Sequence, residues 1–479
     1  MTTANLSIPT SSKREFSVSN EITYNRTGPV RWIFSHLFRY PFLMLSFAIC
    51  AALTNVLFSA LPRIIGIAFD EVLKPQPEPW RLTELALFTL GIVILRGVID
   101  LTNSWSIETL GQRLERDSRD ELYSSLLGKS QTFHNRQRVG DIMARANNDV
   151  RQLNPMMNPA AALIIESTMA IVSPLIFISF LDPRLLLSPG IWVVLYIFAV
   201  RRYMRQLNPV AGAQREQFGV MNAALNETIT GIEVVKSAAQ EQQEREKFHS
   251  NAGLFRDYFI KEGQVQARYL PLLLLGFALT GAFAHGVYLY SLGQLSIGQL
   301  VSYMGLMGVL RFPAFISIFT FQLMQMGLAG AERILELMRE ESELDENAAG
   351  YAEEMRGAVA FEDVTFQLEG STLPALKHIS FHAAAGETIA IVGQTGSGKT
   401  TLTKLVNRIY DVSEGHITID GVDVRQWNLA ALRSQISTIE QDIFLFSRTL
   451  GENIAFGKPG ATKEEIIAAS VAAQGSVCP

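Results

Sequence analysis

The stretch ETIAIVGQTGSGKTT, residues 387–401, decides the fold of the C-terminal part of the chain. Residues 387–393 have the β-branched, apolar composition of a buried strand. Residues 393–400 then match the pattern G-x-x-x-x-G-K-[ST], in which glycines let successive backbone N–H groups point into one concavity. The helix predicted over 399–409 adds its N-terminus to that concavity. The stretch therefore predicts a strand, a phosphate-binding loop and a helix in succession.

The residues of this loop have distinct expected roles. Lys399 would neutralise charge on β- and γ-phosphates, and the Thr400 hydroxyl would hold Mg²⁺. The competing interpretation is a glycine loop that is merely flexible, but such a loop needs neither a strand before it nor a helix after it. The candidate binding set is Gly393, Gln394, Thr395, Gly396, Ser397, Gly398, Lys399, Thr400 and Thr401.

Two predicted strands and an acidic segment precede the loop. The strands are expected over 358–368 and 376–382, where short apolar runs are bounded by turn residues. Residues 340–354 carry seven acidic side chains, which is typical of a solvated linker. We therefore place an acidic linker at 339–356 and the domain that carries the loop at 357–479.

The N-terminal two thirds of the chain contain long segments without charge. Residues 40–62 lack Asp, Glu, Lys and Arg, and as a helix they would extend about 35 Å, enough to cross a hydrocarbon core of about 30 Å. The run from 269 to 310 is too long for one crossing, and SLGQLSIG at 291–298 supplies the break that divides it. Six spans are predicted, at 40–62, 85–107, 154–181, 185–200, 269–291 and 298–323.

Composition supports this interpretation and excludes others. Apolar residues make up 48% and charged residues 18% of the 479, with a mean hydropathy of +0.18, whereas soluble domains average about 25% charged residues. A large soluble helical bundle is the alternative, but its buried helices seldom run twenty residues without a charge. The net charge of −5 and the lack of a basic stripe argue against a nucleic-acid partner. Two cysteines, Cys50 and Cys478, make neither a disulfide framework nor a thiolate metal site.

Basic residues between the spans predict the orientation. The connections 108–153 and 201–268 carry eight and ten Lys or Arg residues, and the other connections are nearly bare. The positive-inside rule then places both termini and both long connections in the cytoplasm. We expect a cytoplasmic tail at 1–28 and a membrane domain at 29–338 that starts with a short interfacial helix. Within the spans, Arg96 and Asp100 are four residues apart and are expected to neutralise each other.

The chain resembles the exporter-type ATP-binding cassette (ABC) half-transporters of the multidrug and lipid group. The resemblance rests on six spans with long cytoplasmic extensions, followed by AERILELM at 331–338 and GETIAIVGQTGSGKTTLTKLVNRIYDVSEGHITIDGVDV at 386–424. IEQDIFLFSRTLGENIAFG at 439–457 is similar to the family's glutamine loop. Residues 132–150 and 226–248 look like the two segments that couple the spans to the ATPase domains.

This resemblance implies a multi-domain architecture and a function. It implies a six-helix transmembrane domain followed by an α/β P-loop nucleotide-binding domain, with ATP and Mg²⁺ as cofactors. Gln441 would contact Mg²⁺ and the attacking water, so that Lys399 and Gln441 form the implied catalytic pair. The protein would export a hydrophobic or amphipathic substrate across the plasma membrane, as a homodimer or as a heterodimer with another half-transporter.

The sequence departs from the family pattern in two places. The position where the family stacks an aromatic side chain on adenine is occupied by Leu368. The LSGGQ-like signature, the Walker B aspartate with its catalytic glutamate and the switch histidine do not occur in this sequence, so we expect a nucleotide-binding domain truncated at Pro479. The alternative function is therefore a membrane-embedded protein that binds ATP without hydrolysing it, as a regulatory chain or a non-functional remnant.

Overall fold

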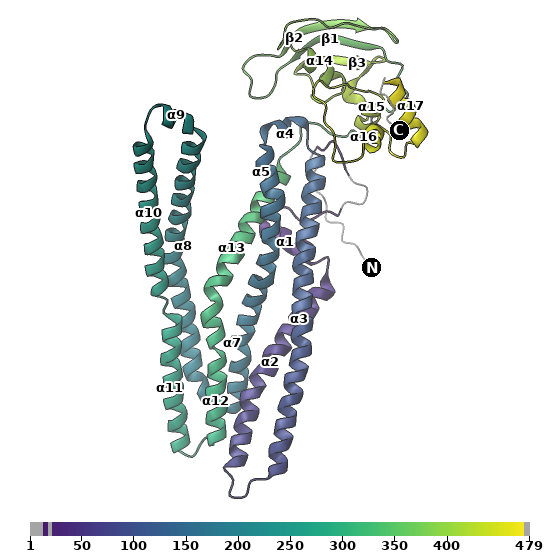
Figure 1. Cartoon of the computed structure of the whole chain (residues 1–479). Coiled ribbons are helices and arrows are strands. Elements are labelled where there is room, and N and C mark those ends of the chain that lie inside the picture. The colour runs from purple at the N-terminus through teal and green to yellow at the C-terminus, as the bar shows by residue number, and fades with distance from the viewer. Residues whose placement is uncertain (1–12, 18–21, 474–479) are drawn as a thin grey trace. The chain divides into compact units, whose positions relative to one another are not determined.

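The computed structural model describes residues 13–17 and 22–473. The chain divides into two compact units. The first, called here the helical unit, comprises residues 24–118 and 148–333. The second, called the sheet unit, comprises the described residues among 1–23 together with 119–147 and 334–473. Figure 1 labels the elements of both, and each unit is described by itself.

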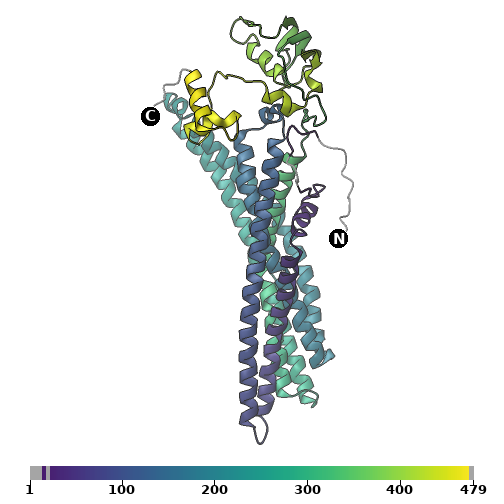
Figure 2. The same cartoon turned by 90° about the vertical axis from the view of Figure 1, so that its right-hand side faces the viewer.

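The helical unit is built from long helices joined by short turns (Figures 1 and 2). Several begin with proline in the first turn, where the missing N–H has no intrahelical partner to lose. The α-helices that lie wholly or partly in this unit are α1 (Pro29–Leu37), α2 (Pro41–Val72), α3 (Pro79–Leu127), α6 (Val150–Pro155), α7 (Ala162–Leu181), α8 (Leu187–Thr230), α9 (Ile232–Ser237), α10 (Glu241–Ala267), α11 (Pro271–Ser291), α12 (Ile297–Val309) and α13 (Arg311–Arg339).

Six helical stretches among the described residues are long and apolar enough to cross a membrane. They contain the six predicted spans almost entirely: Pro41–Val72, Pro79–Leu127, Val139–Leu181, Pro183–Thr230, Glu241–Ser291 and Ile297–Ile316. The predicted break is confirmed, because α11 ends at Ser291 and α12 begins at Ile297. Ser296 and Gln299 form a capping box at the start of α12, which satisfies two otherwise unpaired N–H groups. The expected helical extensions beyond the apolar stretches are also confirmed: α3 and α8 continue to Leu127 and Thr230, and α10 precedes the apolar helix α11, with a break at 268–270 between them.

Polar contacts inside the helical unit join helices that lie side by side. The predicted Arg96–Asp100 pair is present at 3.4 Å, and Thr54 of α2 donates to Asp100 of α3 at 2.7 Å. Both views show α2 and α3 running together from their short connection (Figures 1 and 2). The Asp70 carboxylate of α2 accepts hydrogen bonds from the Ser296 hydroxyl at 2.6 Å and the Gly298 N–H at 2.7 Å. These bonds fix α2 to the first turn of α12.

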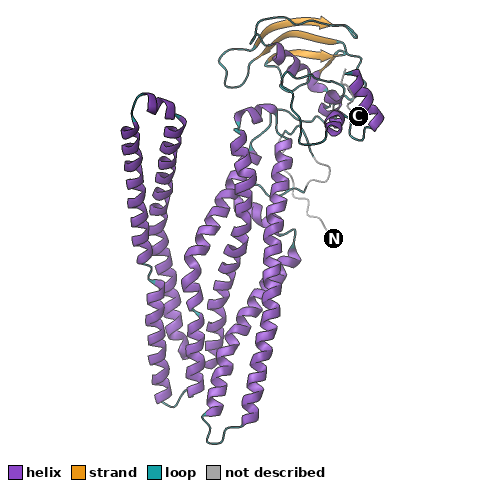
Figure 3. Cartoon of the chain, in the orientation of Figure 1, coloured by secondary structure: helices purple, strands orange, loops and turns teal. Residues whose placement is uncertain are grey.

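Among the described residues, the sheet unit holds one sheet of four antiparallel strands in the order β2-β1-β3-β4, and Figure 3 shows strands in orange. The expected strands at 358–368 and 376–382 are confirmed as β1 (Val359–Phe366) and β2 (Leu376–Ala383), and β3 (Glu414–Ile419) and β4 (Val422–Asp423) follow. Leu402 and Leu405 of helix α14 pack in one buried cluster with Phe361 of β1 and Ile417 of β3. The helices of this unit besides the end of α3 and α13 are α4 (Gln131–Arg136), α5 (Val139–Ala144), α14 (Lys399–Val406), α15 (Leu429–Ser434), α16 (Leu450–Ile454) and α17 (Lys463–Ala472).

One predicted element is wrong. Residues 387–393 form no strand, and their apolar side chains are exposed, with Val392 exposed by 89%. A strand is stabilised by backbone hydrogen bonds to a neighbouring strand, and no described residue provides such a ladder here. The β-branched composition is therefore present without the partner that would make it a strand.

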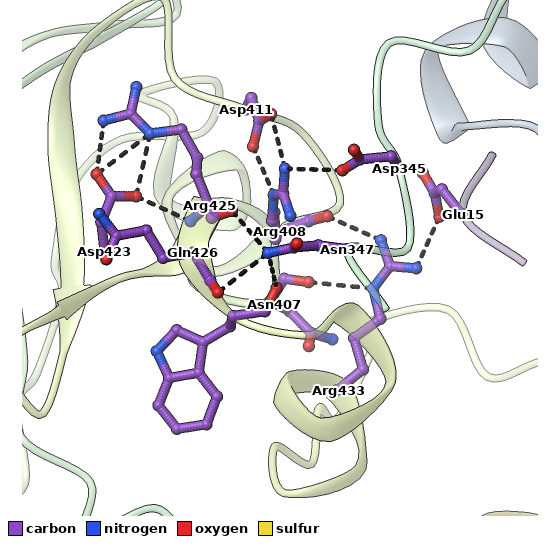
Figure 4. Close-up of polar contacts among 11 residues, drawn as sticks. Glu15, Asp345, Asn347, Asn407, Arg408, Asp411, Asp423, Arg425, Gln426 and Arg433 are labelled. Carbon is purple, nitrogen blue, oxygen red and sulfur yellow. Dashed lines mark hydrogen bonds and ion pairs between the residues drawn. The ribbon is translucent and has the colours of Figure 1, made fainter. Parts of the chain in front are cut away.

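The acidic segment is more ordered than a solvated linker. Its carboxylates lie mainly at the surface, but Ser342 and Leu344 are buried. The Asn347 side chain donates to the carbonyl groups of Gln426 at 3.0 Å and Trp427 at 3.1 Å (Figure 4). Charge composition predicted the exposure of the carboxylates correctly, but it did not predict the uncharged groups that help to attach the segment.

A turn aspartate joins the start of β1 to the end of β3. The Asp420 carboxylate accepts hydrogen bonds from the N–H groups of Arg356 at 2.6 Å, Ala358 at 3.0 Å and Gly357 at 3.3 Å. Burial raises the pKa of Asp420, but the three N–H groups lower it by more, and the pKa lies below its ordinary value. The carboxylate form therefore favours the folded state.

We expect Asp420→Asn to lower the free energy of unfolding by about 1 to 2 kcal/mol at pH 7. A depressed folded pKa gives stability that is fully present above the ordinary value, about 3.9, and is lost as the pH falls through the folded pKa. The difference between wild type and variant should accordingly shrink as the pH falls below about 4. Urea unfolding of the full chain followed by tryptophan fluorescence measures it, with the exposed Asp442→Asn as control; a pH-independent difference would contradict the assignment.

Candidate phosphate-binding site

The predicted loop connects the region after β2 to helix α14. Gly396 has φ +83° and Gly398 has φ +90°, both in the left-handed region that favours glycine. Gly398 is the N-cap residue of α14. A Cβ atom at Gly398 would lie 2.8 Å from the Ala375 carbonyl oxygen, so a side chain at this position would force the backbone apart. The backbone conformation therefore favours glycine at Gly396 and Gly398, and the close Ala375 carbonyl also excludes a side chain at Gly398.

Lys399 folds back over the loop that precedes it. Its ammonium donates to the carbonyl oxygens of Gln394 at 2.7 Å and Gly393 at 2.9 Å. An ammonium group has three donors, so this arrangement leaves capacity for an anion and holds the positive charge at the mouth of the loop. Thr400 and Thr401 follow in the first turn of α14, whose leading N–H groups have no intrahelical acceptor.

The residues of the candidate set therefore lie together. The N–H groups, the Lys399 ammonium and the Thr400 hydroxyl are the donor types that suit a polyphosphate and its magnesium ion. Among the residues that the structure describes there is no group of three His, Cys, Asp or Glu side chains able to hold a metal by themselves. A magnesium ion here would thus depend on the phosphates for most of its ligands.

Two further predicted residues, Gln441 and Leu368, lie outside the loop in the sequence. Gln441 lies in an exposed stretch without helix or strand, and its side chain makes no hydrogen bond with any residue in the described part of the chain. Leu368 lies just after β1 and is 40% exposed. Both assignments remain predictions.

The first of the two expected coupling segments, residues 132–150, lies mostly within the sheet unit, where α4 contacts residues of the linker and of the strand-bearing part. Asn135 of α4 donates to the Tyr410 hydroxyl at 2.9 Å. Arg136 pairs with Glu343 at 2.9 Å and also with Glu369. The sequence predicted the segment but not its partners Tyr410 and Glu369, because single polar residues in loops carry no periodic signal.

The fold and this site together define a class of protein. A chain with six apolar helices long enough to cross a bilayer, joined to a small sheet-containing domain with a phosphate-binding loop, is a multi-pass membrane protein with a nucleotide-binding domain.

Comparison with known proteins identifies the family. Residues 43–314 match the family described as the ABC transporter transmembrane region, and residues 376–475 match the family described as ABC transporter. The chain belongs to the ABC transporter family. The resemblance stated from the sequence is thereby confirmed.

Several curated proteins are similar along most of the chain. An ATP-dependent lipid A-core flippase of Thiobacillus denitrificans is 32% identical over 419 residues, which is 86% of this chain and 72% of that protein. The flippase of the same name from Syntrophus aciditrophicus is 27% identical, over 89% of this chain and 71% of that protein. The uncharacterized ABC transporter ATP-binding protein YknU of Bacillus subtilis is 27% identical over 94% of this chain and 77% of that protein.

Proposed function

We propose that the protein is one half of a dimeric exporter that uses ATP to move a hydrophobic or amphipathic substrate across the plasma membrane. The observation that carries the proposal is the phosphate-binding loop, with Lys399 held at its mouth, in the same chain as six candidate spans. The names of the similar flippases support an amphipathic substrate, since lipid A is such a molecule. The partner would be a second copy or another half-transporter.

The loop residues would divide the work of holding ATP. The N–H groups from Gly393 to Thr401 would bind the phosphate oxygens, and Lys399 would exchange its carbonyl partners for the β- and γ-phosphates. Thr400 would bind Mg²⁺ through its hydroxyl. Gln441 would contact the ion and the attacking water. Magnesium would supply charge neutralisation on the phosphates.

The proposed topology follows from charge and from the loop's chemistry. ATP is a cytoplasmic cofactor, and the basic connections are expected on the same side of the membrane. The proposed domains are a cytoplasmic tail at 1–28, a membrane domain at 29–338, a linker at 339–356 and the nucleotide-binding domain at 357–479. The contacts of α4 with Tyr410 and Glu343 through Asn135 and Arg136 support a cytoplasmic position for the first long connection.

A second candidate function is ATP binding without turnover. The loop and Lys399 account for phosphate binding, whereas hydrolysis also requires a residue that orients the attacking water, the role predicted for Gln441. A chain of this kind would bind nucleotide and change conformation without consuming it.

Reconstitution distinguishes the two functions. The purified full chain is placed in liposomes, and binding of MgATP, release of phosphate and uptake of a fluorescent amphipathic lipid are measured on the same preparation. Export predicts all three, with uptake only into vesicles whose loop faces the added ATP. Binding without phosphate release would support the second function, and absence of binding would contradict both.

The position of Leu368 makes a separate prediction. If the adenine ring packs there, Leu368→Tyr should tighten ATP binding roughly 5-fold or more, because an aromatic ring gains about 1 to 3 kcal/mol by stacking on a base. Titration of the full chain with MgATP measures the change. The matched control is Leu373→Tyr, which adds the same ring at a neighbouring exposed position. Equal effects of both substitutions would place the base elsewhere.

A further inference from the structure

A short N-terminal segment, residues 13–17, is bound to two other parts of the sheet unit. This segment is called the strap. The Glu15 N–H donates to the Gly128 carbonyl just after α3 at 2.9 Å, and the Arg14 carbonyl accepts from the Glu346 N–H at 2.6 Å. The Ser17 hydroxyl donates to the Glu346 carboxylate at 3.0 Å. The strap is thus held by a backbone contact with Gly128, the residue after α3, and by backbone and side-chain contacts with Glu346 of the linker.

The packing of the strap against Gly128 is close. A Cβ atom at Gly128 would lie 2.8 Å from the Phe16 carbonyl oxygen. The strap backbone therefore occupies space that only a glycine leaves free. This contact and the hydrogen bonds specify one position of the segment along the unit.

The Glu15 side chain reaches an arginine on helix α15. Its Oε2 atom accepts from Arg433 Nη1 at 2.7 Å (Figure 4). The Glu15 side chain is 11% exposed and the Arg433 side chain 28%. The second carboxylate oxygen of Glu15 is buried with no hydrogen-bond partner among the described residues, so the ion pair is the interaction that compensates its desolvation.

Arg433 uses its remaining nitrogens on a different element. Nη2 donates to the Arg408 carbonyl at 2.8 Å, and Nε donates to the Asn407 carbonyl at 3.3 Å. These carbonyls lie just past the last residue of α14, Val406, where the partial negative charge of the helix accumulates. Arg433 therefore holds the turn that directly follows the C-terminal end of the helix whose N-terminal end carries the phosphate-binding loop.

The two ends of α14 are mechanically linked. The helix is eight residues long and is seated on the sheet through Leu402 and Leu405. With Glu15 and the two carbonyls as acceptors, the Arg433 guanidinium has one orientation. Without Glu15, one of its N–H groups is left unpaired, and the guanidinium must turn to find another partner. Without Glu15, Arg433 would turn away from the Asn407 and Arg408 carbonyls. If α14 then shifted, the N–H groups of Lys399 and Thr400 would move with it.

We propose that the strap positions the phosphate-binding helix, with Glu15 and Arg433 as the positioning residues. The cytoplasmic tail is in this way a structural part of the nucleotide site. The nucleotide part of the proposal rests on the proposed function, and the mechanical part rests only on the contacts of Glu15, Arg433 and α14.

The test uses the full chain in lipid nanodiscs. Glu15→Gln and Arg433→Gln remove the ion pair, and Glu15→Asp and Arg433→Lys keep the charges. The matched control is Glu354→Gln, which neutralises an exposed carboxylate of the linker that has no contact with Arg433. Two quantities are measured: the dissociation constant for MgATP, and amide hydrogen exchange over residues 407–410.

We expect Glu15→Gln to weaken MgATP binding roughly 3- to 10-fold and to speed exchange at 407–410. The double variant Glu15→Gln with Arg433→Gln should be no weaker than Arg433→Gln alone, because both residues act through one contact. Glu15→Asp should recover most of the affinity, and Arg433→Lys should recover little because an ammonium cannot reach three acceptors. The control should match the wild type.

Failure of this proposal is distinguishable from failure of the proposed function. If the wild type binds no MgATP, the proposed function is wrong, and exchange at 407–410 still decides whether the strap holds α14. If the wild type binds MgATP and Glu15→Gln changes neither quantity, the strap proposal is overturned. A lower melting temperature with unchanged affinity would also overturn it, since the role would then be structural only.

Discussion

Lys399→Ala is expected to weaken MgATP binding by the full chain about 10- to 100-fold and to eliminate any ATP turnover, because hydrogen bonds to charged groups contribute about 1.5 to 3 kcal/mol each. The ammonium already lies at the mouth of the loop, 2.7 Å from the Gln394 carbonyl. Its removal leaves the phosphate charge facing backbone N–H groups alone. Isothermal titration gives the affinity, and phosphate release gives the turnover.

Lys404→Ala is the matched control for this substitution. It removes the same ammonium group from the same helix, α14, five residues farther along the chain. The two variants lose equal net charge, so nonspecific electrostatic attraction falls equally in both. An affinity that drops equally in the two variants would show that Lys399 acts as a general positive charge and would contradict the phosphate-loop assignment.

A larger group should not replace Lys399 well. Lys399→Arg preserves the charge, but the planar fork has to fit where a compact ammonium contacts the carbonyls of Gly393 and Gln394. We expect it to recover less than a tenth of the lost affinity. If Lys399→Arg bound MgATP as tightly as the wild type, positive charge alone would be sufficient at this position.

The membrane-spanning helices could be predicted because their physical cause is local. Twenty residues without charge form a helix that is stable in hydrocarbon whatever lies around it. The turn between α11 and α12 could also be predicted from its own residues, since Gly293 adopts φ +71° and Ser296 caps the next helix. In the loop, Gly396 and Gly398 show the left-handed φ values that the motif implies.

The elements that could not be predicted depend on residues far away in the chain. Residues 387–393 have strand composition, but a strand also requires a neighbour, and composition does not show whether one is present. Gln441 was assigned by resemblance to the family's glutamine loop, and that assignment stays a prediction. Glu15 looks like any solvated tail residue in the sequence; its role depends on Arg433, which lies 418 positions later.

The second large effect is expected at the crossing of α2 and α12. A Cβ atom at Gly298 would lie 2.0 Å from the Gly66 carbonyl oxygen and 2.5 Å from the Asp70 carboxylate. Both obstacles are fixed, because Asp70 is hydrogen-bonded to Ser296 and to Gly298 itself. Small residues allow such close approach of helices in membranes. Gly298→Ala must therefore separate the helices and break the Asp70 contacts.

We expect Gly298→Ala to lower the stability of the full chain in nanodiscs by about 2 to 3 kcal/mol, since overpacking of a close contact typically costs 1 to 3 kcal/mol. Gly308→Ala is the control in the same helix, where a Cβ atom would meet no other atom within 4 Å. There the same substitution should be stabilising by up to about 1 kcal/mol, because alanine loses less backbone entropy than glycine in a helix. Thermal unfolding measures both, and the opposite signs are the decisive result. If both substitutions stabilise the protein, α2 and α12 do not approach each other as the Gly66–Gly298 contact requires.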